Sequence, residues 1–444
     1  MKIVGLITEY NPFHNGHKHH LNEALKRTGA DYAIVVMSGN FVQRGAPAII
    51  PKHLRTQIAL EAGAAVVIEL PVFFATGSAE LFAAGAVSLL HSLNCVDSIC
   101  FGTESGDIVS LSKIARILCD EPDDYKFFLQ NHLKNGDSFP LARQKAFGEV
   151  TGDTSLSAIL ESPNNILGIE YIKALCRLNS SITPVAIQRE ESHYHDMELK
   201  TVYSSASAIR NVFAQAENSF SDISEILKDQ IPRACISFLQ NTFQRRYPIY
   251  TNDFSLLLKY KLLTETKETL LTYMDINETL ANRIYKNKNN FLTFEQFCEE
   301  IKTRDLTYTR VSRALLHILL HVKKADCAAP AYARILGFRQ DSSTVLSVMK
   351  RQSRIPLITK LSSASLEEKE SFYLKQDIFA SDLYESVVTD KFQTPFNTNR
   401  RLCAVRRTIS CLLVVISFSL CRLQLTLPVQ CDTPRLEKAV SFLS

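Results

Sequence analysis

The chain has 444 residues, which is more than one ordinary domain holds, so its length predicts two or three domains. Apolar residues make up 46% and charged residues 22%, a balance that excludes an intrinsically disordered chain and can supply sizeable cores. The formal net charge of +4 neither requires nor excludes a nucleic-acid partner, because a local basic face can lie within a nearly neutral total.

The N-terminal half alternates strand and helix patterns. Short apolar runs typical of buried parallel strands occur at residues 2–8, 31–37, 64–70, 96–101 and 184–188. Helical patterns lie between them, around Leu21–Leu25, at 54–62, at 78–93 and from Ser204 onward. Strands that alternate with helices predict a doubly wound parallel sheet, which binds its ligands at the carboxyl ends of the strands.

From about residue 215 the pattern becomes mainly helical, with amphipathic stretches at 254–264 and 310–322. The tail holds an apolar run, Thr408–Cys421, that is shorter than the roughly 20 residues of a membrane-spanning helix. A buried strand pair or core helix is therefore the favoured interpretation of the run, with a membrane anchor or an altered C-terminus as alternatives. The predicted fold is α/β, with a nucleotidyltransferase-like catalytic domain at 1–215, a mainly α-helical domain at 216–395 and an atypical tail at 396–444.

The cysteines and the N-terminus indicate a cytoplasmic protein. Eleven Cys residues are scattered without a Cys-x-x-Cys pair or a Cys/His spacing that fits zinc, so we expect reduced thiols and no metal site. Residues 2–8 pass directly from apolar to polar residues, which predicts a first strand and not a signal peptide. We expect no membrane partner, and the residues specify no oligomeric state.

The loop after the first predicted strand carries the clearest chemical pattern. His14 and His17 lie in a His-x-Gly-His sequence that opens a helix. A helix N-terminus presents unpaired N–H groups and a positive dipole end, both of which favour phosphate, and Gly16 allows close backbone approach. Two imidazoles there can stabilise charge as pyrophosphate leaves. A His-rich turn without function is the alternative, and the strand-to-helix context disfavours it.

A second pattern begins the helix near Ser204. Ser205 and Ser207 place hydroxyls at a helix start, and Arg210 follows one turn later, where it can pair with a phosphate. Together with His-x-Gly-His, the segment resembles the Ser-x-Thr-x-x-Arg signature of HIGH-type nucleotidyltransferases, with Ser207 in the Thr position. His14, His17 and Arg210 are therefore the candidate catalytic residues.

Several longer strings resemble the bacterial tRNA(Met) cytidine acetate ligase family, over residues 1 to about 385. The strings are Met37–Gly45, Val67–Pro71, Phe101–Glu104, Ser162–Tyr171, Tyr194–Asp196, Tyr308–Arg310 and Tyr332–Phe338. Two sites depart from the family pattern: Ala46 replaces an expected Glu, and Pro51-Lys52-His53 replaces an expected Asp-Lys-aromatic run. The departures concern local substrate contacts and leave the ATP site intact.

The resemblance implies an enzyme that uses ATP to convert acetate to acetyl-adenylate and passes the acetyl group to N4 of the wobble cytidine of elongator tRNA(Met). ATP is then a co-substrate that brings Mg²⁺ with it, and no tightly bound cofactor is expected. The implied ATP contacts, with the two serines above, are Ile7, Thr8, Glu9, Tyr10, Asn11, Pro12, Phe13, His14, Asn15, Gly16, His17, Lys18, His19, His20, Gly102, Asn165 and Arg189. Asn165 is equally suited to cap the helix that begins near Ile166, Gly102 to be a turn glycine, and Arg189 to be a solvated charge.

Transfer to a tRNA base requires a docking surface and a path to the acceptor. Asn40, Gln43 and Arg44 follow the second predicted strand and are candidate substrate contacts at its carboxyl end. In the helical part, Arg283–Asn290 mixes an aromatic residue with cations, a pattern typical of single-stranded RNA contacts. The tRNA candidates are Lys286, Lys288, Arg310 and Arg313, with Arg245, Arg246, Lys302 and Arg304 as further basic residues.

Two other functions fit parts of the pattern. An adenylyltransferase that acts on a phosphorylated small molecule in coenzyme biosynthesis would explain both motifs but not the helical part. A non-catalytic RNA-binding protein on the same fold would not need His14, His17 and Arg210.

Overall fold

The computed structural model describes residues 1–189, 205–216, 219–325, 329–397 and 402–405. Residues Met1–Arg407 form one compact unit. The string Tyr194–Asp196 and the apolar run Thr408–Cys421 lie outside the described residues.

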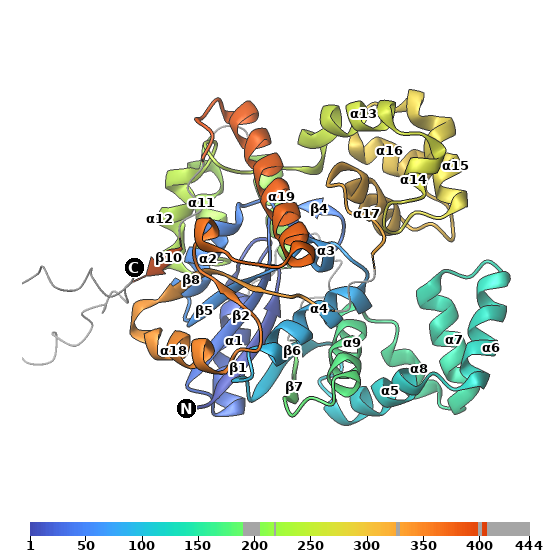
Figure 1. Cartoon of the computed structure of the whole chain (residues 1–444), viewed down its shortest axis with the longest axis horizontal. Helices are drawn as coiled ribbons and strands as arrows, with labels where there is room; N and C mark the ends of the chain where they lie inside the picture. Colours follow the sequence, from blue (N-terminus) through green and yellow to red (C-terminus); the bar gives the residue numbers. More distant parts are fainter. Residues whose placement is uncertain (190–204, 217–218, 326–328, 398–401, 406–444) are drawn as a thin grey trace, which may run out of the picture. The chain divides into compact units, whose positions relative to one another are not determined.

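An eight-stranded sheet organises this unit, with strand order β10-β8-β5-β2-β1-β6-β7 and β9 paired to β8 (Figure 1). The strands are β1 (Ile3–Thr8), β2 (Tyr32–Ser38), β5 (Val66–Leu70), β6 (Ser98–Thr103), β7 (Thr183–Gln188), β8 (Ala333–Arg339), β9 (Leu357–Ile358) and β10 (Cys403–Val405). The five strands from β5 to β7 are mutually parallel, which confirms the predicted α/β fold. The strand order reverses between β1 and β6, so the ligand-binding switch point of such a sheet lies there.

Alternate residues of β1 face two separate cores, as the two-residue period of a strand requires. Val4 and Leu6 belong to the core under α1 (Asn15–Thr28), α2 (Lys52–Glu61) and α10 (Ala206–Gln215). Ile3 and Ile7 belong to the other core, under α4 (Ala79–Ser92) and α9 (Pro163–Arg177). A Cβ on Gly5 would lie 2.7 Å from Leu90 of α4, so this position needs glycine for the helix to approach the strand.

Two helical groups accompany the sheet (Figure 1). The first comprises α5 (Ile108–Asp120), α6 (Asp123–Lys134), α7 (Phe139–Thr151) and α8 (Thr154–Ile159). The second comprises η1 (Thr251–Phe254), α13 (Ser255–Thr264), α14 (Lys267–Leu270), α15 (Glu278–Asn287), η2 (Lys288–Asn290), α16 (Phe294–Ile301) and α17 (Tyr308–Leu319). The remaining elements are β3 (Phe41–Val42), β4 (Ala46–Pro47), α3 (Val72–Ala75), α11 (Ser221–Leu227), α12 (Arg233–Thr242), η3 (Gln340–Ser342), α18 (Ser343–Gln352), η4 (Leu361–Ser363) and α19 (Glu368–Phe392).

After α17 the chain returns to the sheet, which the prediction of a mainly helical segment at 216–395 did not include. β8, which contains most of the Tyr332–Phe338 string, pairs antiparallel with β5, and β10 pairs parallel with β8. Short apolar runs do not distinguish a strand from part of a buried helix, so this strand was hidden in the sequence. The division into three domains stays a prediction. Among the described residues, no helix combines the length and apolar composition needed to cross a membrane.

Candidate active site

A cavity of about 260 Å³ lies where β1, β6 and β7 end, at the switch point of the sheet. It brings together the two predicted phosphate motifs, although their residues are far apart in the sequence. The predicted residues that line it are Ile7, Thr8, Glu9, Tyr10, Asn11, His14, Gly16, His17, His19, His20, Gln43, Arg44, Gly102, Arg189, Ser205, Ser207 and Arg210.

The two histidines of His-x-Gly-His lie against each other at the start of α1. His14 precedes the helix with extended backbone, φ −143° and ψ 174°. The two imidazole rings stack with their centroids 3.7 Å apart, and the His14 backbone N–H donates to His17 Nδ1 at 3.3 Å. Because Nδ1 of His17 accepts this bond, a neutral His17 ring carries its proton on Nε2.

Burial keeps these imidazoles neutral at physiological pH. It lowers the pKa of His14 to about 3, with further lowering by the Arg189 and Arg210 charges. Burial, followed by the His14 and Arg189 charges, holds the pKa of His17 well below its ordinary value, and burial lowers the pKa of His20 to about 4. His14 Nδ1 and His20 Nε2 are buried without a hydrogen-bond partner, so both can bind atoms of a ligand.

Arg210 joins the second motif to the first. Ser205 caps α10, its hydroxyl accepting from the Ala208 backbone N–H at 3.0 Å. One turn later, Arg210 donates to the Ser207 hydroxyl at 2.8 Å and to the backbone carbonyl oxygen of Asn11 at 2.7 Å. The guanidinium is thus oriented at the cavity wall, where its charge can pair with a phosphate.

A buried arginine that the sequence did not single out fastens the strand ends behind the cavity. Arg55 of α2 is fully buried and donates to the backbone carbonyl oxygens of Glu9, Ser38, Gly39 and Ile50. Burying a guanidinium is costly unless its N–H groups are satisfied, and here carbonyls of two strand ends satisfy them. The conformations of the β1 and β2 ends therefore depend on one side chain.

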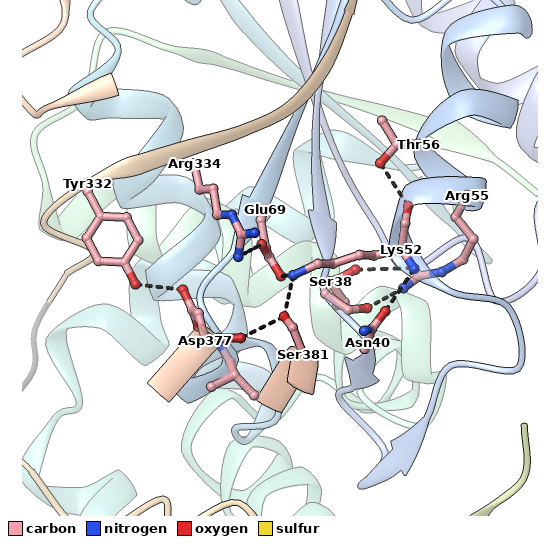
Figure 2. A network of polar contacts seen from close by, with 12 residues as sticks. Ser38, Asn40, Lys52, Arg55, Thr56, Glu69, Tyr332, Arg334, Asp377 and Ser381 are labelled. Atoms are coloured by element: carbon pink, nitrogen blue, oxygen red, sulfur yellow. Dashed lines mark hydrogen bonds and ion pairs between the residues drawn. The ribbon is translucent and has the colours of Figure 1, made fainter. Parts of the chain in front are cut away.

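A second buried network of polar side chains joins β5, α2, β8 and α19 (Figure 2). Glu69 at the end of β5 pairs with Lys52 at 2.6 Å and with Arg334 of β8 at 3.0 Å. Lys52 also donates to Ser381 of α19 at 2.7 Å. On the neighbouring turn of α19, Asp377 accepts from Tyr332 at 2.6 Å.

This network supports the loop after β2, which carries the candidate substrate contacts Asn40, Gln43 and Arg44. A Cβ on Gly39 would lie 2.4 Å from Glu69 Oε1, so the carboxylate leaves room only for glycine. The Lys52 backbone N–H donates to Asn40 Oδ1 at 2.8 Å. Lys52, which keeps the expected Lys between the two departures Pro51 and His53, is thus placed in the buried network and not in the cavity.

Several residues predicted to bind ATP or substrate do not line the cavity; they are Pro12, Phe13, Asn15, Lys18, Asn40 and Asn165. Asn165 accepts from the backbone N–H groups of Glu104 and Ser105 at 3.0 and 3.1 Å and donates to the Ile159 carbonyl oxygen at 3.1 Å. Its amide thus orders the loop after β6. The expected helix cap at Asn165 is wrong, because α9 begins at Pro163 with Ser162 at its N-cap.

Other lining residues were missed by residue-level reasoning: Phe82, Phe101, Pro163, Asn164, Leu167, Tyr171, Ile187, Gln188 and Ala206. The apolar members come from α4, α9, the ends of β6 and β7, and the start of α10. Such residues are read from sequence as ordinary core, and only their position beside strand ends could have identified them.

The four tRNA candidates lie outside the cavity, in the second helical group. Lys286 and Lys288 are at the end of α15 and in η2, where Lys288 Nζ lies 4.4 Å from the centre of the Tyr285 ring. Arg313 instead pairs with Asp275 at 2.8 Å, while its backbone N lies only 2.4 Å from where a Cβ on Gly45 would be. Arg310 is half-buried on α17.

The buried imidazoles, the serine-capped helix and Arg210 at the switch point define a nucleotide-binding site of the nucleotidyltransferase class. A family model described as HIGH nucleotidyl transferase matches residues 1–399. The chain is 43% identical to a tRNA(Met) cytidine acetate ligase of Acetivibrio thermocellus, over 86% of this chain and 94% of that protein. It is 40% identical to the protein of the same name from Caldanaerobacter subterraneus, over 86% and 95%.

Solved structures agree with these sequence relatives. The apo form I crystal structure of Thermotoga maritima TmcAL matches with a TM-score of 0.85 and 32% identity, over 91% of this chain and 100% of that chain. The structure of the same protein bound with alpha-thio ATP matches with a TM-score of 0.81, also at 32% identity. The chain belongs to the tRNA(Met) cytidine acetate ligase family of HIGH nucleotidyltransferases.

Proposed function

We propose that this chain is an ATP-dependent ligase that converts acetate to acetyl-adenylate and then transfers the acetyl group to N4 of the wobble cytidine of elongator tRNA(Met). The names of its relatives and the ATP analogue in the neighbouring structure support this assignment. The observation that carries it is the convergence of His14, His17 and Arg210 on one cavity at the switch point.

The first step needs charge stabilisation more than proton transfer. An acetate oxygen attacks the α-phosphorus of ATP, and the bond to the pyrophosphate oxygen breaks. Acetate is already ionised, so no base is required. His14, His17 and Arg210 are placed to donate hydrogen bonds to the phosphates as negative charge moves onto pyrophosphate.

The second step needs a better leaving group than acetate offers. Acetate alone would have to expel oxide, whereas acetyl-adenylate expels AMP, so the weakly nucleophilic cytosine amino group can react. Flexible anticodon nucleotides can be splayed out and bound by a pocket. Lys286, Lys288 and Arg310 are proposed to bind the tRNA backbone, while Gln43 and Arg44 at the cavity contact the substrates.

Mg²⁺ is proposed to enter with ATP. Within the described residues, no group of three or more His, Cys, Asp or Glu side chains could hold a metal ion. Mg²⁺ commonly binds through substrate phosphates, one or two carboxylates and water, so a dedicated cage is not required. No tightly bound cofactor is proposed.

Pyrophosphate release tests the assignment. The full chain is incubated with ATP and one second substrate at a time, which is acetate, phosphopantetheine or nicotinamide mononucleotide. We expect release only with acetate. Release with either phosphorylated compound would instead identify a coenzyme adenylyltransferase, and release with none of them, with or without tRNA, would indicate a non-catalytic protein.

A further inference from the structure

Glu9 is an unexpected side chain for a phosphate site. It is the only Asp or Glu among the cavity-lining residues that the structure describes. The resemblance groups it with the ATP contacts of residues 7–20, but a carboxylate repels the phosphates of ATP. Its charge therefore requires a different partner.

Glu9 lies directly after β1, which ends at Thr8, and lines the cavity together with Phe82 of α4 and Leu167 and Tyr171 of α9. The buried residues of α4 and α9 belong to the core on one face of the sheet. After burial, the charge of the Glu9 carboxylate contributes to raising the pKa of Tyr171 on α9, and both residues line the cavity. His14 and Arg210, in contrast, belong to α1 and α10 on the opposite face.

Two hydrogen bonds fix Glu9 in place. Its Oε1 accepts from the Gln43 backbone N–H at 2.8 Å, and its backbone carbonyl oxygen accepts from the buried Arg55. Oε1 and Oε2 together have about four acceptor positions, of which the Gln43 bond occupies one. A carboxylate held in this way at a cavity wall is preorganised to accept further hydrogen bonds from a substrate.

The wall beside Glu9 suits a flat base. Phe82, Phe101, Leu167 and Tyr171 line the same cavity, and the rings of Phe101 and Tyr171 lie 5.5 Å apart. Proteins bind unpaired bases by stacking them on aromatic side chains and hydrogen-bonding their edges. Cytosine presents a donor at N4, for which Asp and Glu are the matching acceptors.

We propose that Glu9 accepts a hydrogen bond from the N4 amino group of the target cytosine and takes its proton during acetyl transfer, an assignment that rests on the proposed function. The N4 lone pair forms the new C–N bond to the acetyl carbon. The bond from that carbon to the phosphate oxygen of AMP breaks, and AMP leaves with the electron pair. The N4 proton passes to the Glu9 carboxylate. Phosphate groups enter from the α1 and α10 face and the base from the α4 and α9 face.

The test separates the two half-reactions in the full-length protein. Acetate-dependent exchange between ATP and labelled pyrophosphate reports the first step. Transfer from synthetic acetyl-adenylate to elongator tRNA(Met), without ATP, reports the second. In Glu9→Gln, exchange should stay at the wild-type rate and transfer should fall by about 10²-fold or more, the usual contribution of a general base. Glu9→Asp, which keeps the carboxylate, should restore part of the transfer.

A matched control completes the design. Glu23→Gln on α1, where Glu23 pairs with Lys26 and Arg27 outside the cavity, should leave both steps unchanged.

Two results would overturn the role of Glu9. One is wild-type transfer in Glu9→Gln. The other is a loss of exchange as large as the loss of transfer, which would place Glu9 on the adenylylation step, for example as a Mg²⁺ ligand. Failure of the wild-type protein both to exchange pyrophosphate in the first assay and to acetylate tRNA in the second would instead contradict the proposed function.

Discussion

The guanidinium of Arg210 donates a hydrogen bond to the backbone carbonyl oxygen of Asn11 at 2.7 Å, which fastens the second phosphate motif to the first. Its second bond, to the Ser207 hydroxyl, keeps the planar group in one orientation. The two motifs therefore act as one structural unit, although α1 ends at Thr28 and α10 begins only at Ala206.

Replacing Arg210 by Lys tests this geometry while keeping the charge. An ammonium cannot reproduce the planar fork that reaches Asn11, Ser207 and a phosphate together. Loss of one charged hydrogen bond costs about 1.5–3 kcal/mol, so kcat/KM for ATP in pyrophosphate release should fall by about 10- to 100-fold. Arg177→Lys, at a solvent-exposed pair with Glu80, is the control and should retain the wild-type value. Equal values for Arg210→Lys and the wild type would remove Arg210 from the ATP site.

The stacked histidines should act in the first step. His17→Ala should lower acetyl-adenylate formation by roughly 10²-fold or more, the scale of losing a preorganised donor, and His14→Ala should have a smaller effect. Pyrophosphate release in variants with wild-type melting temperatures measures this. His132→Ala, whose ring bonds to Glu149 on the surface, serves as the control. Wild-type release from both cavity variants would exclude the phosphate role of these imidazoles.

The basic residues of the second helical group should act on tRNA and not on ATP. Lys286→Gln, Lys288→Gln and Arg310→Gln combined should weaken tRNA binding and flatten its salt dependence, because fewer counterions are released. Acetate-dependent pyrophosphate release without tRNA should persist. Filter-binding titrations at several salt concentrations measure the tRNA affinity and its salt dependence. Lys350→Gln with Arg351→Gln on α18 removes two positive charges at another place, and a loss of affinity per charge as large as in the triple variant would show that the three residues have no specific role.

The buried network in Figure 2 predicts a pH-dependent stability. Burial and the nearby Glu69 charge raise the pKa of Asp377 from 3.8 to about 6. Because the folded pKa is higher than the unfolded one, this carboxyl favours folding below about pH 4, and that contribution is lost as the pH rises to about 6.

Asp377→Asn should remove this component. The free energy of unfolding of the wild type, minus that of the variant, should therefore decrease between pH 4 and pH 6. Urea titrations at fixed pH measure the difference, and Asp382→Asn on the same helix supplies the comparison. A difference that is constant with pH would contradict the raised pKa.

The parallel sheet and its motifs were predictable because their causes are local. Short apolar runs identified β1, β2, β5, β6 and β7, and the His-x-Gly-His loop could be recognised from a strand end and a helix start. The return of the chain to the sheet at β8 was not predictable, since its apolar run resembles part of a buried helix.

The support of the site depends on long-range contacts that no local pattern contains. In the sequence, Arg55 is an ordinary basic residue of a helix. Its role is visible only in the fold, where four backbone carbonyl oxygens surround it. For Asn165 the sequence allowed two roles, a ligand contact or a helix cap. Only the fold shows that its amide bonds to the loop at Glu104. Tyr171 and Phe82 could be assigned to the core but not to a cavity wall.

The order of the two half-reactions is the central claim, and one measurement tests it most directly. Synthetic acetyl-adenylate is supplied with elongator tRNA(Met) and no ATP, and the tRNA nucleosides are analysed by mass spectrometry. Acetylated cytidine at the wobble position is expected for the wild type and also for His17→Ala, which lacks an efficient first step but keeps the second. An absolute requirement for ATP, or acetylation that uses acetyl-coenzyme A in place of acetate, would contradict the account.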